Sequence, residues 1–483
     1  MEVLRKYIKD ESIDLCYIDP PFNSKRNYNQ IYNNIGKEDK AQAQAFVDTW
    51  EWDIHADQGY KEILDNYNNV FTKQSIALIQ GIEGVLGRGS LLAYLVSMTL
   101  RIAEIYRVLK PTGSFYLHCD PTASHYLKLV LDGIFCTRGG DFRNEIIWCY
   151  TGPGSPGMRQ FMRKHDVIFW YNKSNTWIFN RDEVRVEHSK KTKENYKKGL
   201  IGSGFVEADH KIHERGKVPE DWWQMAIAPR GKEYLGYPTQ KPEALLERII
   251  KASSNEGDVI LDAYCGCGTS VAVAERLNRG WIGIDITYQS ISLILKRLEE
   301  HFGKSALDNI KLNGAPKDFA SAEALAHKKD DRTRKEFEKW AILTYSKNKA
   351  IINEKKGGDG GIDGIAYTVI GYENNKYATE QILFSVKSNH TLTPSVIRDL
   401  NGTIEREKSA MGILITLYPM PNLTKEAKKY GTYKNELFDH IYPKIEVVCI
   451  QDILDGKTLN ISTTADVLKE AELKKNNMQP KLF

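Results

Sequence analysis

Four consecutive residues near the start of the chain have the types and order needed to hold a planar amine. Asp19, Pro20, Pro21 and Phe22 directly follow the apolar segment 13–18, which is typical of a buried strand. The Asp19 carboxylate and the Pro20 carbonyl can each accept one hydrogen of an amino group, which draws out the lone pair of a poorly nucleophilic nitrogen. Two prolines stiffen this turn, and the Phe22 ring offers a face on which a base can stack. A strand that simply ends in a turn is the alternative.

A glycine-rich turn lies further along the chain, between a predicted strand at 258–260 and a predicted helix at 270–277. Gly266 and Gly268 let the backbone approach a ligand closely, and a helix start favours electron-rich groups. The next predicted strand, 281–285, ends in Asp285, at about the 20-residue spacing expected for an acceptor of a ribose hydroxyl. A dinucleotide site is the structural competitor. The spelling D-x-Y-x-G-x-G-T differs from G-x-G-x-x-G, and it favours S-adenosylmethionine over NAD.

In this order the two motifs resemble those of the beta-class DNA amino-methyltransferases, over residues 1 to about 300. In that family the catalytic motif precedes the cofactor motif, and the segments 109–118, 144–148, 164–171 and 237–242 match it as well. The resemblance implies an α/β, Rossmann-like domain that uses S-adenosylmethionine and acts on a base flipped out of double-stranded DNA. The D-P-P-F spelling favours adenine N6, with cytosine N4 as the alternative.

The resemblance also assigns roles to individual residues. Asp19, Pro20, Pro21 and Phe22 form the expected catalytic motif, and the segment before helix 243–253 is expected to close over the methionine end of the cofactor. The residues expected to bind the cofactor are Thr239, Gln240, Lys241, Asp262, Tyr264, Gly266, Gly268, Thr269 and Asp285. Target recognition is expected from about 173–235. The candidates there for contacts with the DNA backbone are Lys190, Lys191, Lys193, Lys197 and Lys198.

The residues after the polar stretch 311–331 indicate a second α/β domain over 332–474. Their pattern is a helix at 335–344, a glycine-rich loop, strands at 365–372 and 381–387, a helix at 395–409 and a strand at 411–417. This order resembles the PD-(D/E)xK restriction-endonuclease-like fold, particularly its Mrr-like branch. The resemblance implies that Asp363 is a metal ligand, with Mg²⁺ as the expected ion, and that Lys387 is the catalytic lysine.

One position departs from the nuclease pattern. Ser385 stands two residues before Lys387, where the family normally has Glu or Gln, so Asp363, Ser385 and Lys387 are candidates for a centre with one weakened ligand. The acids weighed as replacements are Glu336, Glu338, Glu354 and Glu380. A cleaving nuclease and a module retained only for DNA binding both stay open.

A second departure concerns the start of the chain. Family members have a further strand, ending in Gly-Asp, before the D-P-P strand, whereas this sequence begins in the helix expected after it. We therefore expect a truncated fragment with impaired cofactor binding as one alternative. Three hypotheses result: a methyltransferase whose second domain clamps DNA, a bifunctional methyltransferase and endonuclease, and a DNA-binding protein that has lost catalysis. RNA is a minor alternative substrate.

Length and composition agree with a chain of more than one domain. The boundaries expected within the 483 residues are 1–310 for the first domain, 311–331 for a linker, 332–474 for the second domain and 475–483 for a polar tail. The 67 basic and 63 acidic residues leave a net charge of only +4, so DNA affinity must come from local patches. The seven scattered cysteines fit buried fillers in the reducing cytoplasm of a prokaryotic cell, in a host-encoded or phage-encoded protein. We expect no signal peptide and no membrane span, and a homodimer stays open.

Overall fold

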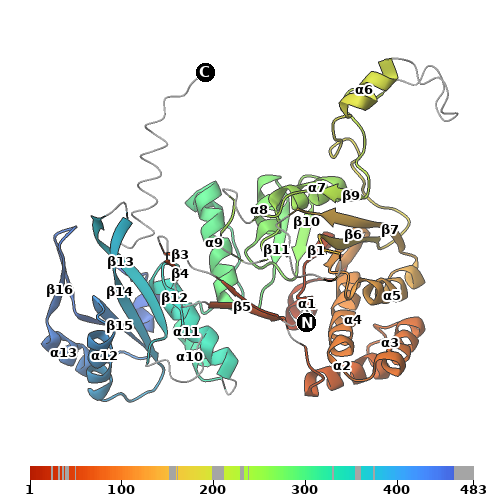
Figure 1. The fold of residues 1–483 in the computed structure, drawn as a ribbon. Coiled ribbons are helices and arrows are strands. Elements are labelled where there is room, and N and C mark those ends of the chain that lie inside the picture. Colours follow the sequence, from red (N-terminus) through yellow and green to blue (C-terminus); the bar gives the residue numbers. More distant parts are fainter. Residues whose placement is uncertain are drawn as a thin grey trace. The chain divides into compact units, whose positions relative to one another are not determined.

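The computed structural model describes most of the chain as two compact units. The described residues are 1–22, 26–30, 33–34, 37–38, 43–48, 50–151, 159, 161–197, 212–228, 233–235, 237, 239–328, 331–353, 361–373 and 376–461. Apart from short segments, the first unit ends at Asp285 and the second begins at Ile286 (Figure 1). The helix that follows Ile286 is therefore grouped with the second unit, whereas the sequence placed the boundary near 310.

A seven-stranded sheet forms the centre of the first unit. Its strands, in spatial order, are β11 (Gly280–Gly283), β10 (Val259–Asp262), β1 (Ile13–Ile18), β6 (Leu109–Cys119), β8 (His165–Asn172), β7 (Asp141–Cys149) and β9 (Trp222–Gln224). Strands β11, β10, β1 and β6 are parallel, whereas β8 runs antiparallel to both β6 and β7. The chain continues from β1 toward β6 and later returns on the other side of β1 as β10. The boundary between β1 and β10 is therefore a topological switch point, the usual ligand position in open α/β sheets.

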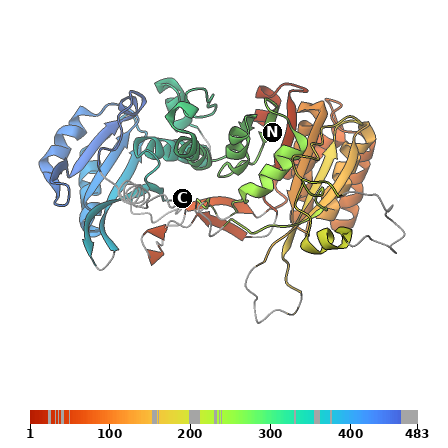
Figure 2. The ribbon, with the colours of Figure 1, turned by 90° about the horizontal axis from the view of Figure 1, so that it is seen from above.

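Helices cover both faces of this sheet, as Figure 2 shows from above. One face packs against α1 (Glu2–Tyr7), α2 (Ile54–Asp65), α3 (Lys73–Leu86), α4 (Ser90–Val108) and α5 (Ser124–Ile134). The other face packs against α7 (Glu243–Ser253) and α8 (Thr269–Arg276). Successive residues of β1 alternate between these two cores: Cys16 and Ile18 belong to the first, and Leu15 and Tyr17 to the second. A strand buried on both faces explains why segment 13–18 is a nearly continuous apolar run.

The second unit has a five-stranded mixed sheet. Its strands, in spatial order, are β12 (Ile351–Ile352), β13 (Gly364–Glu373), β14 (Lys376–Lys387), β15 (Met411–Thr416) and β18 (Ile445–Cys449). Strands β14, β15 and β18 are parallel, and β13 is antiparallel to β14. One core contains residues of α11 (Asp331–Tyr345), α10 (Phe319–Ala326) and α14 (Ile450–Leu454), with α9 (Tyr288–Phe302) at its margin. A separate core contains residues of α12 (Ser395–Arg406) and α13 (Pro421–Ala427).

The remaining elements are short. They are β2 (Arg26–Gln30), β3 (Asn33–Asn34), β4 (Lys37–Glu38), β5 (Ala43–Asp48), α6 (Lys190–Lys197), β16 (Thr432–Asn435), β17 (His440–Pro443) and three 3-10 turns, Cys136–Arg138, Lys304–Leu307 and Lys428–Tyr430. None of the helices in the described part of the chain is both long and apolar enough to span a bilayer.

Most elements expected from the sequence are present, with shifted ends. Strand β1 and helix α7 have the expected bounds, whereas β11 ends at Gly283 rather than at 285 and α12 ends at Arg406 rather than at 409. The stretch 311–331, expected to be a polar connector, contains helix α10. Asp318 caps this helix by accepting a hydrogen bond from the backbone N–H of Ser321, and Ala322 and Ala326 are buried. Alanine-rich packing of this kind leaves little hydrophobic signal in a sequence, which is why the helix was missed.

Candidate functional site

The two sequence motifs lie at the same edge of the first sheet. Strands β1 and β10 are parallel neighbours, with Leu15 opposite Ile260 and Cys16 opposite Leu261. Their carboxyl ends therefore bring Asp19 and Asp262 to the switch point together. Burial raises the pKa of Asp262 to about 7, although hydrogen bonds from Ser270 and the Tyr264 N–H lower it. The negative charges of Asp19 and Asp285 add to the increase, so the carboxyl groups of Asp19 and Asp262 interact.

Asp19 has one carboxylate oxygen with a hydrogen-bond partner and one without a partner among the described residues. Oδ2 accepts a hydrogen bond from the Lys241 ammonium, and both side chains are largely buried, at 16% and 11% exposure. Oδ1 is buried and has no hydrogen-bond partner among the described residues. A buried acceptor without a donor is costly, so it fits a ligand that brings an N–H group. This is the chemistry expected for a base amine.

Aromatic rings lie near the Lys241 ammonium that holds Asp19. The Phe22 ring stacks on the His118 imidazole at a centroid distance of 5.7 Å and an interplanar angle of 29°. The Lys241 ammonium lies 5.5 Å from the centre of the Phe22 ring. Trp148 meets the His118 ring edge-on at 5.6 Å. The Phe22 ring therefore packs against His118, which itself packs against Trp148, so packing as well as the turn defines its position.

A hydrogen-bond chain orients the His118 ring. The Tyr17 hydroxyl is 2.9 Å from Nδ1 of His118, and Nε2 of His118 is 3.1 Å from Oδ2 of Asp166. Oδ1 of the same carboxylate accepts a hydrogen bond from Tyr150 at 3.2 Å. Burial alone would raise the pKa of Asp166, but the hydrogen bond from His118, together with the charge of Lys241 and the hydrogen bond from Tyr150, lowers it. Asp166 is therefore an ionised acceptor, and His118 Nε2 is its donor.

Sequence reasoning did not single out His118, Asp166 or Tyr150. His118 and Asp166 belong to segments that resembled the family, but they were not given roles. The sequence signal that could have indicated them is that His118 and Asp166 stand near the adjoining ends of two apolar strands, β6 and β8, which pair antiparallel.

The Tyr17 hydroxyl is a donor to this chain of hydrogen bonds. Burial and the charge of Asp19 raise the pKa of Tyr17 well above its usual value, so its hydroxyl stays protonated and can donate to Nδ1 of His118.

Two carboxylates brace the glycine-rich turn. Asp262 Oδ1 accepts a hydrogen bond from the backbone N–H of Tyr264 at 3.0 Å, and its Oδ2 accepts one from Ser270. Asp285 Oδ2 accepts a hydrogen bond from the backbone N–H of Gly266 at 3.0 Å. Gly266 and Gly268 have φ angles of 48° and 72°, in the left-handed region that favours glycine. The turn can therefore approach a ligand closely while its shape stays fixed.

The other residues expected to bind the cofactor take different positions. Gln240 is buried, and its side chain forms hydrogen bonds with the preceding loop. It accepts from the Leu235 N–H at 2.9 Å and donates to the Glu233 carbonyl at 2.5 Å. Thr269 is buried at the first position of α8, and Thr239 is half-buried. Burial raises the pKa of Tyr264, against an opposing interaction with Arg101. Gln240 thus supports the segment that carries Lys241.

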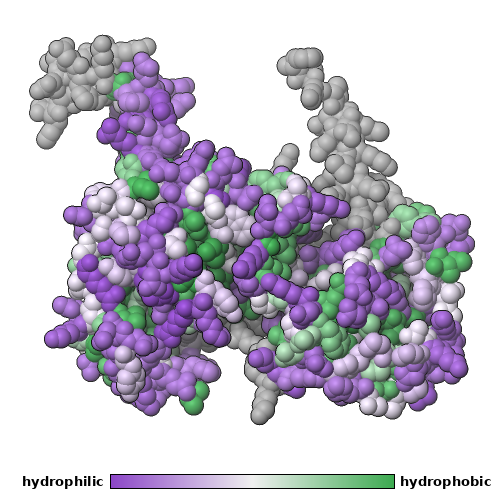
Figure 3. All heavy atoms as spheres, turned by 180° about the vertical axis from the view of Figure 1, so that it is seen from behind, coloured by the Kyte–Doolittle hydropathy of each residue, from purple (hydrophilic) through white to green (hydrophobic). Residues whose placement is uncertain are grey.

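The lysine-rich segment forms a helix that stands away from the sheet of its unit (Figure 1). Ser189 caps α6 by accepting a hydrogen bond from the Thr192 N–H at 3.1 Å. Lys190, Lys191 and Lys193 are exposed. The projecting surface that carries this helix is hydrophilic in Figure 3. The side chain of Lys197 and the whole of Lys198 lie outside the described residues.

In the second unit, Asp363 lies against the strand that carries Ser385 and Lys387. Its Oδ2 accepts a hydrogen bond from the backbone N–H of Val386 at 2.7 Å, and its own N–H donates to the Phe384 carbonyl at 2.8 Å. Ser385 is buried. The three candidates from the sequence are therefore together at the carboxyl end of β14.

Glu338 of α11 interacts with this group. Burial, followed by the charge of Asp363, raises the pKa of Glu338, while Lys387 opposes the shift. Glu336 is engaged elsewhere, since it accepts hydrogen bonds from the Tyr288 N–H and from Lys339. Glu380 interacts with Tyr433, and Glu354 lies outside the described residues. Of the acids weighed from the sequence, the interactions thus favour Glu338.

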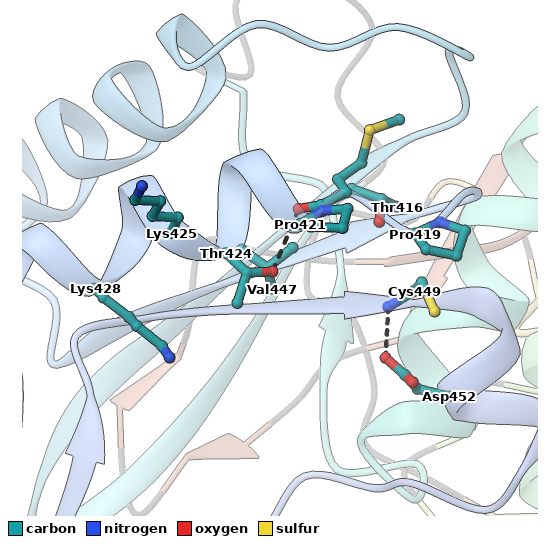
Figure 4. Close-up of a pocket in the computed structure, with 10 residues that line it drawn as sticks. Thr416, Pro419, Pro421, Thr424, Lys425, Lys428, Val447, Cys449 and Asp452 are labelled. Atoms are coloured by element: carbon teal, nitrogen blue, oxygen red, sulfur yellow. Dashed lines mark hydrogen bonds between the residues drawn. The ribbon is translucent and has the colours of Figure 1, made fainter.

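A pocket of about 410 Å³ opens beyond the carboxyl ends of β15 and β18 (Figure 4). Thr416 and Cys449, which pair across these strands, contribute to its wall together with Lys425 and Lys428. Asp452 adds a negative charge and accepts a hydrogen bond from the Cys449 N–H at 3.0 Å. The lining therefore combines charges of both signs.

The first unit has the architecture of an α/β enzyme with two motifs at its switch point, one suited to an amine and one to a nucleoside cofactor. A model of the N6/N4 DNA methylase family matches residues 13–296, and the chain belongs to this family. A restriction endonuclease model, for the Mrr catalytic domain, matches residues 330–453. Both resemblances indicated by the sequence are thereby confirmed, and so is the α/β fold class of the two parts.

Individual relatives cover only parts of the chain. The type II methyltransferase M.HpaI of Haemophilus parainfluenzae is 33% identical over 222 residues, which are 45% of this chain and 64% of that protein. The DNA adenine methyltransferase YhdJ of Escherichia coli K12 is 27% identical over 313 residues, 63% of this chain and 83% of that protein. The structure of the cytosine-N4-specific PvuII DNA methyltransferase aligns with a TM-score of 0.38 and 16% identity, covering 64% of this chain and 85% of that one. The chain thus spans just under two thirds of the length of M.HpaI.

Proposed function

We propose that the first unit transfers a methyl group from S-adenosylmethionine to the exocyclic amine of a base flipped out of double-stranded DNA. The observation that carries this proposal is the buried Oδ1 of Asp19, which has no hydrogen-bond partner among the described residues and lies at the switch point of the sheet. Phe22, whose ring stacks on His118, follows three residues later. Membership of the DNA methylase family supports it. When bound, the cofactor supplies a methyl group on a positively charged sulfur, so the enzyme contributes mainly positioning.

Asp19, Pro20 and Phe22 of the catalytic motif would contact the target base in this proposal. Asp19 Oδ1 accepts one hydrogen of the target amine, and the Pro20 carbonyl accepts the other, which returns electron density to the nitrogen. Lys241 holds Asp19 in place through Oδ2. The Phe22 ring, supported by His118, stacks on the base.

The turn formed by Tyr264, Gly266 and Gly268 is the proposed cofactor site. Its fit rests on two left-handed glycines and on a helix that begins at Thr269. Thr239, Lys241 and Asp285 are proposed contacts at its border. Lys190, Lys191 and Lys193 are proposed contacts with DNA phosphates, and self-association stays a prediction.

Adenine N6 is the proposed target atom. The D-P-P-F spelling supports it, and so does the name of the Escherichia coli relative, a DNA adenine methyltransferase. Cytosine N4 is the competing target. An Asp carboxylate suits either amine, so the choice depends on the rest of the base pocket.

The test is transfer of a labelled methyl group from S-adenosylmethionine to unmethylated DNA by the full chain, followed by digestion to nucleosides. Labelled N6-methyladenine is the expected product. Labelled N4-methylcytosine would keep the mechanism and change the base. Cofactor binding without transfer would contradict DNA as the substrate, and absence of cofactor binding would support the alternative of a catalytically impaired DNA-binding protein.

A second function, metal-dependent cleavage of DNA, is favoured by the group around Asp363. Glu338 has a pKa raised by burial and by the charge of Asp363, and Lys387 lies close enough to oppose the shift. Such a group fits a divalent cation, because a cation would offset the repulsion between the two carboxylates. Asp363 and Glu338 would hold the ion, and Mg²⁺ is the expected one. We propose that Glu338 takes the place of the acid that is missing at Ser385.

Lys387→Ala, Asp363→Asn and Glu338→Gln are each expected to reduce Mg²⁺-dependent cleavage of unmethylated DNA by at least about 100-fold, because each removes a group that stabilises developing charge. Methyl transfer should be unchanged, since all three residues belong to the second unit. Glu336→Gln, in the same helix, is the matched control. Equal losses in Glu336→Gln and Glu338→Gln would contradict the role of Glu338. No cleavage by the unaltered chain would leave DNA clamping as the role of this unit.

A further inference from the structure

Three potential metal ligands meet in the second unit, apart from Asp363. Glu323 on α10 and His327 at the end of that helix are four residues, or about one turn, apart, and His390 follows β14. One ligand atom from each residue lies within 4.8 Å of the other two. Glu323 is half-buried, and both histidines are exposed. Glu323 and His327 precede residue 330, where the match to the restriction endonuclease family begins.

Hydrogen bonds determine which nitrogen of His390 is free to bind. The Tyr418 hydroxyl donates to the Glu323 carboxylate at 2.6 Å, because an ionised carboxylate can only accept. The same hydroxyl oxygen is 2.8 Å from Nε2 of His390. Its single proton is already used, so Nε2 must be the donor in this contact. Nδ1 of a neutral His390 then carries a lone pair.

The same reasoning applies to His327. Its Nε2 lies 3.2 Å from the backbone carbonyl of Ser388, which can only accept. Nε2 therefore carries the hydrogen, and Nδ1 has the lone pair. The two imidazole rings are 5.7 Å apart and inclined by 34°. A histidine that donates one ring N–H to a carbonyl or another oxygen while the other nitrogen is bare is the arrangement found for metal-binding histidines.

We propose that Glu323, His327 and His390 bind a divalent transition-metal ion, with Zn²⁺ as the best match. Two imidazole nitrogens and one carboxylate oxygen suit Zn²⁺ better than Mg²⁺, which prefers oxygen ligands. Ligand atoms of a tetrahedral zinc site lie about 3.3 Å apart, so ligand atoms that lie within 4.8 Å of one another need to approach by at most about 1.5 Å. Exposed histidine side chains can make this movement by rotation. A water would complete the coordination, and the Tyr418 hydroxyl would orient Glu323 and His390.

The proposed ion would join α10 to the segment that directly follows Lys387. His327 already contacts the carbonyl of Ser388, the residue after Lys387, and His390 lies two residues further on. Binding would therefore fix the end of β14 that carries the candidate nuclease residues. The role is structural, and it is independent of whether that centre cleaves DNA.

The test uses the full chain, freed of metal with a chelator and titrated with Co²⁺, whose visible absorption is intense in tetrahedral sites, and then with Zn²⁺ in competition. One tight site per chain is expected. His327→Ala and His390→Ala should each weaken Co²⁺ binding by at least about 100-fold, since each removes one of three ligands. Tyr418→Phe should weaken it by about 10-fold through loss of an orienting partner.

Two further variants serve as controls. His440→Ala removes an exposed histidine of β17 in the same unit and should leave the affinity unchanged. Asp363→Asn should also leave it unchanged, because Asp363 belongs to the candidate nuclease centre. Equal weakening by His327→Ala and His440→Ala would mean only scattered binding to surface histidines and would overturn the proposal. Loss of the site in Asp363→Asn would place the ion at the nuclease centre instead, and would overturn it as well.

Discussion

Asp19→Asn is expected to lower the rate of methyl transfer by at least about 100-fold, without unfolding the protein. The Lys241 ammonium can only donate, so the amide oxygen of the new side chain turns toward it, as Oδ2 does now. The amide NH₂ group then occupies the position of Oδ1. A donor would face the hydrogens of the target amine, and the nitrogen would not gain the electron density that it needs. Single-turnover transfer at saturating DNA and cofactor measures this step without the contribution of binding.

Asp14→Asn is the matched control for this variant. Asp14 lies on β1, the strand that Asp19 directly follows. It is buried and is also paired with a lysine, Lys110, at 2.7 Å. It additionally accepts a hydrogen bond from the Val259 N–H at 2.9 Å. Its replacement should cost stability but should leave the single-turnover rate unchanged. A rate for Asp19→Asn within about tenfold of the unaltered protein would contradict the proposed role of Asp19.

The parts of the site that the sequence could predict are those in which neighbours along the chain are also neighbours in space. Asp19 and Phe22 follow one buried strand, and Asp262 to Thr269 follow another. Both strands were visible as short apolar runs. Since carboxyl ends of parallel strands share one edge of a sheet, the pairing of β1 with β10 was enough to bring the two motifs together.

The parts that the sequence could not predict depend on contacts between distant residues. His118 and Asp166 are 48 positions apart, and nothing in either segment indicates that β6 and β8 pair antiparallel with this register. Glu338 was one of four candidate acids. Its charge interaction with Asp363 and Lys387, and the hydrogen bonds that hold Glu336 elsewhere, appear only in the structure. His327 and His390 likewise meet only because α10 packs beside the end of β14. Polar residues of this kind have no periodicity that distinguishes them from a solvated surface.

The raised pKa of Asp262 has a cost in stability that depends on pH. An unfolded Asp ionises near pH 3.9, whereas burial raises the pKa of Asp262 to about 7 in the folded protein. Between these two values the folded state holds a proton that the unfolded state has lost, so the free energy of unfolding decreases as pH rises. Below about pH 4 both states are protonated, and above about pH 7 the loss is complete. Three pH units correspond to a loss of about 4 kcal/mol.

This cost is typical of a functional site rather than of a core. A cation placed beside Asp262 would favour its ionised form and would lower its pKa. S-adenosylmethionine carries a positive charge, so its proposed binding at this turn would remove part of the penalty. The ligand-free protein should therefore show the full pH dependence, and the cofactor should reduce it.

Asp262→Asn is expected to abolish this dependence. The amide oxygen can still accept from the Tyr264 N–H, and the Ser270 hydroxyl can act as acceptor for the amide hydrogens, so the turn keeps its hydrogen bonds. Relative to the unaltered protein, the variant should gain about 2 to 3 kcal/mol of stability between pH 5 and pH 8, because that interval covers most of the titration. The measurement is urea unfolding of the ligand-free chain at several pH values, with the transition of the first unit assigned by hydrogen exchange in β10. Asp258→Asn, just before the other end of β10, is the control: it keeps Asp262, so its stability should change with pH in parallel with that of the unaltered protein. A parallel pH dependence for Asp262→Asn and the unaltered protein would show that Asp262 is already ionised in the folded state.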